Sequence, residues 1–307
     1  MTMPPSMTAY CARHYEDAPQ VIEADGSRTW ITRGVSLCVA VTEAVQGTVL
    51  TRDAVDQPDE YILLLPEGVT AQIATPDETV DVEADSLTIV PPGASRIVIS
   101  GAGTVSRVFS DKPVDLLDLA INAQVYSGDI ETDVAKAVAW PDPPGGFRVR
   151  SYPLAQYVDP DGPRIQPRVF RSTNLMINVF APWHSRRDPA TLSPHWHADF
   201  EQASLGISGE FIHHIRYPWE SDSTRWQPDE HARAASPSVM IIPPPSQHTT
   251  QDVGDGTARL VDIFAPPRAD FSQRPGFVIN EAEYPAPDWV AGAKASSGGA
   301  LAGWQKG

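Results

Sequence analysis

The sequence predicts an all-β protein with two double-stranded β-helix (jelly-roll) barrels in one chain, joined by a short helical linker. Short apolar runs recur at a spacing of about 8–12 residues with turn residues between them. The chain of 307 residues also contains 30 prolines and 21 glycines, which favour turns and short strands over long helices. Finally, the pattern of strands and turns occurs twice.

The first copy begins after a polar, irregular stretch that we expect to lie as an arm over the first barrel. Apolar runs at 35–41, 60–65, 85–90 and 105–110 predict its strands. Two of these runs end in proline and glycine residues, which mark turns.

Three anchor points recur in the same order in the second half, and this predicts an internal duplication. Glu60 precedes Gly68 by the same spacing as Glu201 precedes Gly209. The other paired segments are 89–93 with 241–245, and 107–109 with 262–264.

The repeat divides the chain into five parts. The apolar pattern within 114–121 predicts a helix, and a second short helix is expected over 131–139. The alternating segment 147–152 predicts a strand that joins one of the two barrels. The parts are an N-terminal arm (1–28), barrel one (29–111), a linker with short helices (112–164), barrel two (165–268) and a C-terminal tail (269–307).

The charge and the apolar content exclude several partners. With 39 acidic and 23 basic residues, the formal net charge is −16, which disfavours binding to nucleic acid or to an anionic membrane. No secretory signal and no apolar run long enough to span a membrane is seen. Two cysteines, Cys11 and Cys38, do not make a disulfide framework, so a cytoplasmic location is expected.

A cluster of metal-ligand residue types lies in the second copy. His195 and His197 would point to the same side of a strand, with Cα atoms roughly 6.6–7 Å apart, and Glu201 shares their parity. An apolar strand then runs into a proline turn that delivers His248. These four residues are the predicted metal ligands.

The two segments resemble the metal-binding motifs of the cupin superfamily, H-x-H-x(3,4)-E-x(6)-G and P-x-G-x(2)-H. Gly209 falls one place late for the first motif, and Pro245 stands where the second has glycine. The resemblance implies a two-domain (bicupin) protein, in which three histidines and a glutamate hold one divalent metal.

The N-terminal copy is degenerate in this comparison. Ala54 and Asp56 stand where the second copy has His195 and His197, and Arg96 stands where it has His248. We therefore expect barrel one to bind no metal.

Five further residues are candidates for the pocket. Asp262 interrupts an apolar run. Its carboxylate either points into the cavity as an acid/base or pairs with Arg259. Alternation sends one of His213 and His214 inward, as a further catalytic candidate, but does not say which. The candidate substrate-binding residues are Arg216, for an anionic group, and Gln202, for hydrogen bonding near the metal.

For function, the resemblance implies a metal-dependent enzyme acting on a small polar organic acid, in first place an Fe(II) dioxygenase. The alternatives are a metal-assisted isomerase or decarboxylase, or a non-catalytic protein that binds a metal or small ligand. The ligand set does not name the metal, so Mn, Ni and Zn remain alternatives to Fe, and a structural zinc site remains open. A homodimer is also expected, because cupin barrels often pair.

Overall fold

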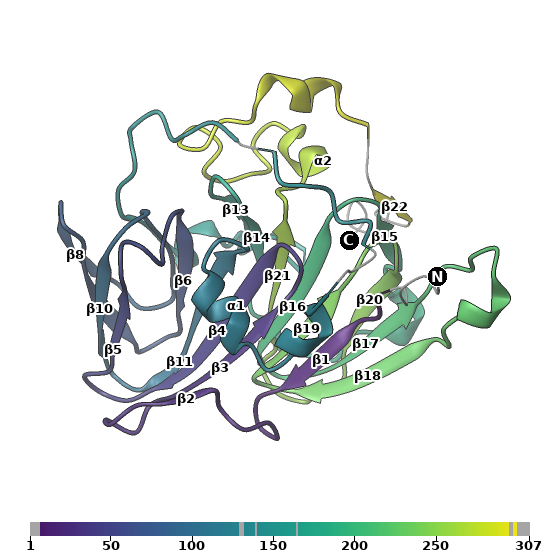
Figure 1. Ribbon diagram of the computed structural model, residues 1–307, viewed down its shortest axis with the longest axis horizontal. Helices are drawn as coiled ribbons and strands as arrows, with labels where there is room; N and C mark the ends of the chain where they lie inside the picture. The colour runs from purple at the N-terminus through teal and green to yellow at the C-terminus, as the bar shows by residue number, and fades with distance from the viewer. Residues whose placement is uncertain (1–6, 129–131, 139, 164, 295–296, 300–307) are drawn as a thin grey trace.

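The computed structural model describes residues 7–128, 132–138, 140–163, 165–294 and 297–299. In this part of the chain the strands form antiparallel sheets of seven, four, six and five strands, with a few short helices (Figure 1). The predicted all-β class is therefore confirmed. No helix in these residues is long and apolar enough to cross a membrane.

The first barrel is built from the seven-stranded and the four-stranded sheets. In spatial order, the larger sheet contains β12 (Arg150–Pro153), β9 (Ser86–Val90), β6 (Tyr61–Leu65), β11 (Gly103–Ser110), β4 (Leu37–Ala44), β3 (Arg28–Arg33) and β2 (Val21–Ile22). The smaller sheet contains β5 (Val49–Arg52), β10 (Ser95–Ser100), β7 (Thr70–Ala74) and β8 (Thr79–Val82).

The second barrel is built from the six-stranded and the five-stranded sheets. The larger contains β1 (Tyr10–Arg13), β19 (Ser238–Ile242), β16 (Glu201–Ser208), β21 (Arg259–Ala265), β14 (Met176–Val179) and β13 (Val169–Arg171). The smaller contains β18 (Glu230–Ala235), β17 (Glu210–Arg216), β20 (Gln247–Asp252), β15 (His195–His197) and β22 (Ser297–Gly299).

The strand order shows the internal repeat. The sequence of neighbours β9-β6-β11-β4-β3 in the first barrel matches β19-β16-β21-β14-β13 in the second, and β5-β10-β7-β8 matches β15-β20-β17-β18. Gly68 and Gly209, which anchored the repeat in the sequence, both have positive φ angles, of 75° and 102°. Glycine adopts this conformation without the steric cost of a Cβ atom.

Helices are short and lie outside the barrel strands. The predicted helix at 114–121 is α1, whereas the expected helix at 131–139 is absent from 132–138, and residues 131 and 139 lie outside the described residues. The α-helices are α1 (Val114–Leu119) and α2 (Ala269–Ser272). The 3₁₀ helices are η1 (Ala123–Tyr126), η2 (Leu154–Tyr157), η3 (Pro189–Thr191), η4 (Ser223–Arg225) and η5 (Asp288–Gly292).

The two barrels exchange edge strands. Strand β1 precedes the first barrel but pairs with β19 of the second, with Cys11 opposite Met240. Strand β12 precedes the second barrel but pairs with β9 of the first. The expectation that the N-terminal arm lies over barrel one is therefore corrected for β1, while the strand predicted at 147–152 joins barrel one.

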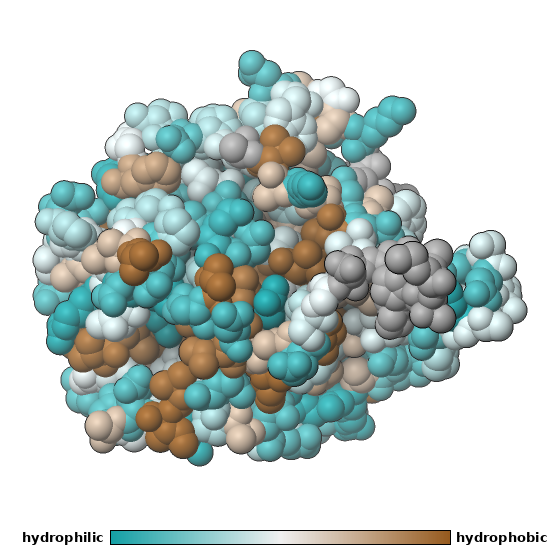
Figure 2. All heavy atoms as spheres, in the orientation of Figure 1, coloured by the Kyte–Doolittle hydropathy of each residue, from teal (hydrophilic) through white to brown (hydrophobic). Residues whose placement is uncertain are grey.

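The larger sheets of the two barrels also pack face to face. Their facing side chains form one apolar cluster that contains residues of both barrels, among them Val39, Ile62, Ala203 and Ile263. Burial of this apolar surface therefore stabilises the contact between the barrels as well as the barrels themselves. The outside of the molecule is largely hydrophilic in the view of Figure 2, with apolar residues in scattered groups.

A buried glutamate from each barrel reaches a hairpin of the other barrel. Glu201 accepts hydrogen bonds from the N–H groups of Val35 (2.9 Å) and Ser36 (2.6 Å), which lie between β3 and β4. Glu60 accepts hydrogen bonds from the N–H and the hydroxyl of Thr173 (3.1 and 3.0 Å), between β13 and β14. Burial raises the pKa of both glutamates, and these hydrogen bonds oppose the rise.

We predict that Gly34→Ala destabilises the protein. A Cβ atom at Gly34 would overlap the carboxylate of Glu201, which cannot move without losing its backbone hydrogen bonds. Overpacking of this kind costs about 1–3 kcal/mol, measured as the free energy of unfolding in urea. Gly256→Ala, where a Cβ atom meets nothing within 4 Å, is the control and should change little. Equal effects of the two substitutions would contradict the close contact between Gly34 and the Glu201 carboxylate.

Candidate metal centre

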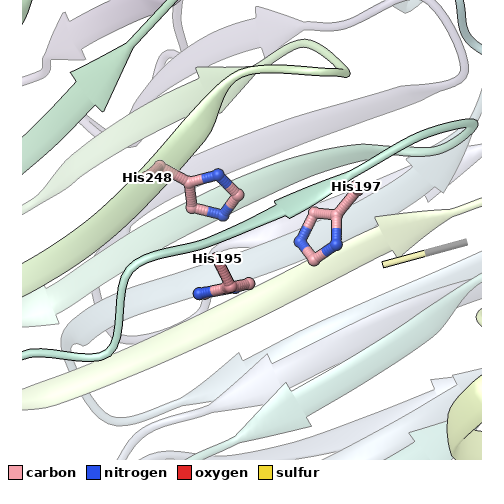
Figure 3. A group of neighbouring side chains, drawn as sticks. All are labelled: His195, His197 and His248. Carbon is pink, nitrogen blue, oxygen red and sulfur yellow. The ribbon is translucent and has the colours of Figure 1, made fainter. Parts of the chain in front are cut away.

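Three histidines converge inside the second barrel. His195 and His197 lie on β15, and His248 lies on the neighbouring strand β20, directly opposite His195 (Figure 3). One nitrogen from each ring lies within 4.8 Å of the others. Among the residues that the structure describes, this is the one such group of three or more histidine, cysteine or acidic side chains.

Two of the imidazoles are fixed by hydrogen bonds to the backbone. Nδ1 of His195 lies 2.9 Å from the carbonyl oxygen of Ser193, and Nδ1 of His248 lies 3.0 Å from that of Ser246. Burial lowers the pKa of His195 to about 4 and that of His248 well below its usual value, so both rings are neutral. Because a carbonyl only accepts, each Nδ1 carries the proton and each Nε2 keeps a lone pair.

Gln202 on β16 provides the fourth polar group. Its Oε1 lies 3.0 Å from Nε2 of His197 and 3.2 Å from Nε2 of His248. Its Nε2 donates to the hydroxyl of Ser204 (3.0 Å), which in turn donates to Asp262 (2.7 Å). This directed chain fixes which end of the amide faces the histidines.

The contact between Gln202 and His248 fits a bound cation. The Nε2 of His248 has a lone pair, so this nitrogen and the amide oxygen are two acceptors facing each other in a buried site. Facing acceptors repel, and a positive ion between them removes the repulsion. Three imidazole nitrogens and one amide oxygen form a neutral donor set that suits a divalent transition metal.

Glu201, the expected fourth ligand, lies elsewhere. It is the residue before Gln202 on the same strand, so its side chain points out of the barrel and binds the β3–β4 hairpin of barrel one. The sequence contained the correcting signal, because the motif's glycine, Gly209, has the required six-residue spacing from Gln202 and not from Glu201. The proline turn does deliver His248: the N–H of Ser246 donates to the carbonyl of Pro243 (3.2 Å), and β20 begins at the next residue.

Asp262 points into the barrel, beside the histidines. Its Oδ1 accepts the hydrogen bond from Ser204, and burial raises the pKa of its carboxyl group to about 6. The alternative partner, Arg259, instead forms ion pairs with Glu67 and with Asp85 on the outside of the barrel. Of the two alternatives from the sequence, the structure therefore places Asp262 in the cavity.

The structure also separates the two candidate histidines of β17. His213 is buried, its Nδ1 lies 3.0 Å from the hydroxyl of Thr250, and burial lowers its pKa to about 4. Its Nε2 has no hydrogen-bond partner among the described residues. His214 points outward, with its Nδ1 2.8 Å from Nδ1 of His231. Of the two, His213 is therefore the one inside the barrel.

Arg216 lies away from the cavity beside the histidines, and a different arginine, Arg187, lines it. Arg216, the candidate for binding an anionic group, is exposed and forms an ion pair with Asp229 (2.6 Å) on the outside of the sheet. Arg187, which belongs to a polar stretch that resembles a solvated loop, lines the cavity beside the histidines instead. Its guanidinium donates to the carbonyl of Thr250 and to the hydroxyl of Ser193, both at 2.9 Å.

Cavities adjoin the centre on one side. A small one of about 50 Å³ lies against His195, Gln202 and His248, and a larger one of about 350 Å³ continues from His195 and Asp262. The larger cavity is lined by Pro163, Ile165, Pro167, Asn178, Phe180, His195, Asp262, Phe264, Arg268, Phe271, Arg274 and Phe277. Several of these residues belong to the C-terminal segment after β21, which the sequence pattern identified only as a tail.

The corresponding place in barrel one is filled differently. Tyr61, which follows Glu60 as Gln202 follows Glu201, forms a hydrogen bond with the hydroxyl of Ser95 (2.8 Å). The surrounding interior is an apolar cluster of buried residues. The buried Arg52 and Arg107 lie beside it, each with its guanidinium 5.6 Å from the ring centroid of Phe109. Arg96, paired with His248 in the sequence comparison, is exposed, so Ser95 and not Arg96 occupies the inward position.

The comparisons with known proteins find similar structures but no match by sequence. No family model and no curated protein matches the sequence. An oxalate decarboxylase from Lactobacillus farciminis, in a formate complex, is similar in structure with a TM-score of 0.57 and 13% identity, over 93% of this chain and 96% of that chain. A mutant of the Bacillus subtilis oxalate decarboxylase gives a TM-score of 0.54 and 11% identity, over 97% and 90%. A further structure of that enzyme, concerned with its Mn(II) centres, gives the same values. At these identities the likeness shows the fold alone, which is the cupin fold that the sequence motifs predicted.

We predict that the metal depends on Gln202 and not on Glu201. Gln202→Ala should weaken the binding of Mn(II) or Zn(II) by about 10–100-fold, and His248→Ala should weaken it further, because each removes a donor. Glu201→Gln should retain one ion per chain even if the protein is less stable. Metal content after dialysis, measured by mass spectrometry beside the thermal midpoint, checks this. Full affinity in Gln202→Ala with loss in a folded Glu201→Gln would show the opposite assignment.

Proposed function

We propose that this protein is a divalent-metal-dependent lyase acting on an organic acid, with decarboxylation as the leading reaction. The observation that carries the proposal is the lone pair of His248 Nε2 facing Oε1 of Gln202 beside two further imidazoles. A metal ion held by His195, His197, His248 and Gln202 would act as a Lewis acid and bind the carboxylate of the substrate.

The neutral donor set favours this chemistry over the dioxygenase that the sequence resemblance placed first. A glutamate ligand would cancel part of the positive charge and would stabilise the higher oxidation state that oxygen chemistry requires. With Gln202 in that position, the full charge of a divalent ion remains available to bind and polarise an anionic substrate. The structural neighbours are oxalate decarboxylases, and one of them is described with Mn(II) centres, which supports a non-oxidative reaction and a metal other than iron.

The chain supplies a proton donor at the right place. Loss of carbon dioxide breaks a carbon–carbon bond, and the electron pair that stays on carbon must take up a proton. Asp262 lines both cavities, and its raised pKa of about 6 keeps part of its carboxyl group protonated near neutral pH. Ser204 holds one oxygen of this carboxyl group, so the group is oriented before the substrate arrives.

The enclosure of the site supports the same reaction. His197, Gln202 and His248 are buried, with exposed fractions of 2% each. Bulk water is therefore kept from the reacting carbon, and electrostatic interactions in the cavity are stronger than in water. Arg187 adds a positive charge to the wall of the small cavity, where it would help to hold an anionic substrate.

The proposal is tested by turnover without oxygen. Protein loaded with Mn(II) or Zn(II) is incubated under argon and under air with a panel of mono- and dicarboxylic acids, and carbon dioxide release is followed by mass spectrometry. We expect equal release under both gases. Consumption of oxygen in proportion to product would instead identify a dioxygenase.

We predict that Asp262→Asn lowers the rate of this reaction by about 10²–10⁴-fold while the metal content stays the same, because only proton transfer is removed. The matched control is Asp255→Asn, an exposed carboxylate paired with Arg186 on the surface, which should leave the rate unchanged. An Asp262→Asn variant that holds metal and turns over at the wild-type rate would contradict the role of this carboxylate.

A further inference from the structure

The larger cavity beside the metal centre has an aromatic wall. Phe264 on β21, Phe271 on α2 and Phe277 behind it stack edge to face in series, with ring centroids 5.9 Å and 4.8 Å apart at angles of 79° and 78°. Phe180 lines the same cavity. Rings arranged in this way present both edges and faces to a further aromatic ring, which is the packing that aromatic groups prefer.

A cation lies at this wall with ring contacts but with no acidic or hydrogen-bonding partner among the described residues. The guanidinium of Arg274 lies 5.7 Å from the ring centroid of Phe271 and 5.2 Å from that of Phe277. Its side chain is exposed and has no hydrogen bond or ion pair to any residue that the structure describes. Arg268, deeper in the cavity, differs in that Asp270 neutralises it through two hydrogen bonds, of 3.0 and 2.7 Å. In a chain with a net charge of −16, this arginine at the mouth of a cavity is a candidate partner for an anionic group of a ligand.

The size of the cavity argues against a very small substrate. A volume of about 350 Å³ corresponds to roughly a dozen water molecules at about 30 Å³ each. Oxalate, with its two carboxylates and no apolar part, would leave most of this space and all of the phenylalanine wall to water. An aromatic ring with its substituents would fill the space and remove the apolar surface from water.

The equivalent segment of barrel one packs against the barrel interior instead of lining a cavity. Helix α1 follows β11 as α2 follows β21, but Leu116 and Leu117 of α1 pack into the apolar cluster of that barrel. Asp115 of the same helix forms an ion pair with the buried Arg52 (2.7 Å). The aromatic cavity is thus a property of the second barrel and its C-terminal segment.

We propose that this cavity selects an aromatic acid with two acidic groups. One carboxylate lies at the metal centre, the ring packs among Phe264, Phe271 and Phe277, and the second anionic group pairs with Arg274. The inference rests on the proposed function for the first carboxylate, whereas the ring and the second anionic group depend on residues outside the metal centre.

The experiment compares three probes on full-length protein loaded with Zn(II), by titration calorimetry. Homophthalate has a ring and two carboxylates, benzoate has a ring and one, and oxalate has two carboxylates and no ring. Homophthalate should bind at least about tenfold more tightly than either, because only this probe makes all three contacts. Tighter binding of oxalate than of homophthalate would overturn the inference.

Substitutions at the wall separate the contributions. Arg274→Gln should weaken homophthalate about tenfold and leave benzoate unchanged, and Arg274→Lys should restore part of the loss. Phe277→Ala should weaken both aromatic probes. The matched control is Arg96→Gln, another exposed arginine without a partner among the described residues, on β10 of barrel one. Unchanged homophthalate affinity in Arg274→Gln would refute the second anionic contact.

Metal content, measured on every sample, distinguishes a failure of the proposed metal centre from a failure of the proposed aromatic-acid pocket. Protein that holds no metal but still binds homophthalate through Arg274 would refute the metal centre and retain the aromatic-acid pocket. Protein that holds one metal ion per chain but shows no preference for homophthalate would retain the centre and refute the pocket.

Discussion

The structure depends on a shared interior between the two barrels that is held in register by two buried glutamates. Glu60 and Glu201 each bind a hairpin of the opposite barrel, and Tyr284 donates a further hydrogen bond to Glu60 (2.6 Å). A buried carboxylate is stable only where donors surround it, so each glutamate fixes the position of the hairpin that supplies those donors. The exchange of β1 and β12 adds backbone pairing to the same interface.

This interface decides which residue faces the metal centre. On a strand between two interiors, alternate side chains serve alternate faces. Since Glu201 is committed to the neighbouring barrel, Ala203 and Leu205 face the shared core with it, whereas Gln202 and Ser204 face the histidines. The neutral donor set that we propose for the metal is therefore a consequence of how the barrels are joined, and the chemistry proposed for the site follows from it.

The sequence allowed the fold and the three histidines to be predicted because both rest on local spacing. Short strands, turn residues and the H-x-H pair need no knowledge of the partner sheet. The choice between Glu201 and Gln202 rested on a single sequence signal, the six-residue spacing of Gly209 from Gln202, because both residues satisfy the permitted spacing from His197. The contact of Glu201 with Ser36 decides the parity. Arg187 and Phe277 were missed for a related reason: they come from a loop and a C-terminal segment whose path across the barrel no periodic pattern reports.

The contrast between the barrels explains how a polar cavity is tolerated. Neutral imidazoles and a buried carboxyl group such as Asp262 contribute little to stability, and an unpaired polar atom such as Nε2 of His213 has a desolvation cost of about 1–3 kcal/mol. At the matching place in the described part of barrel one, Tyr61 and Ser95 satisfy each other beside an apolar core, and the buried Arg107 there leaves its Nε without a partner. Because the two barrels share the interface core, the packing of the first stabilises the second as well. The duplicated fold therefore has two roles: the packed first barrel stabilises the pair, and the second barrel contains a cavity that can hold a ligand.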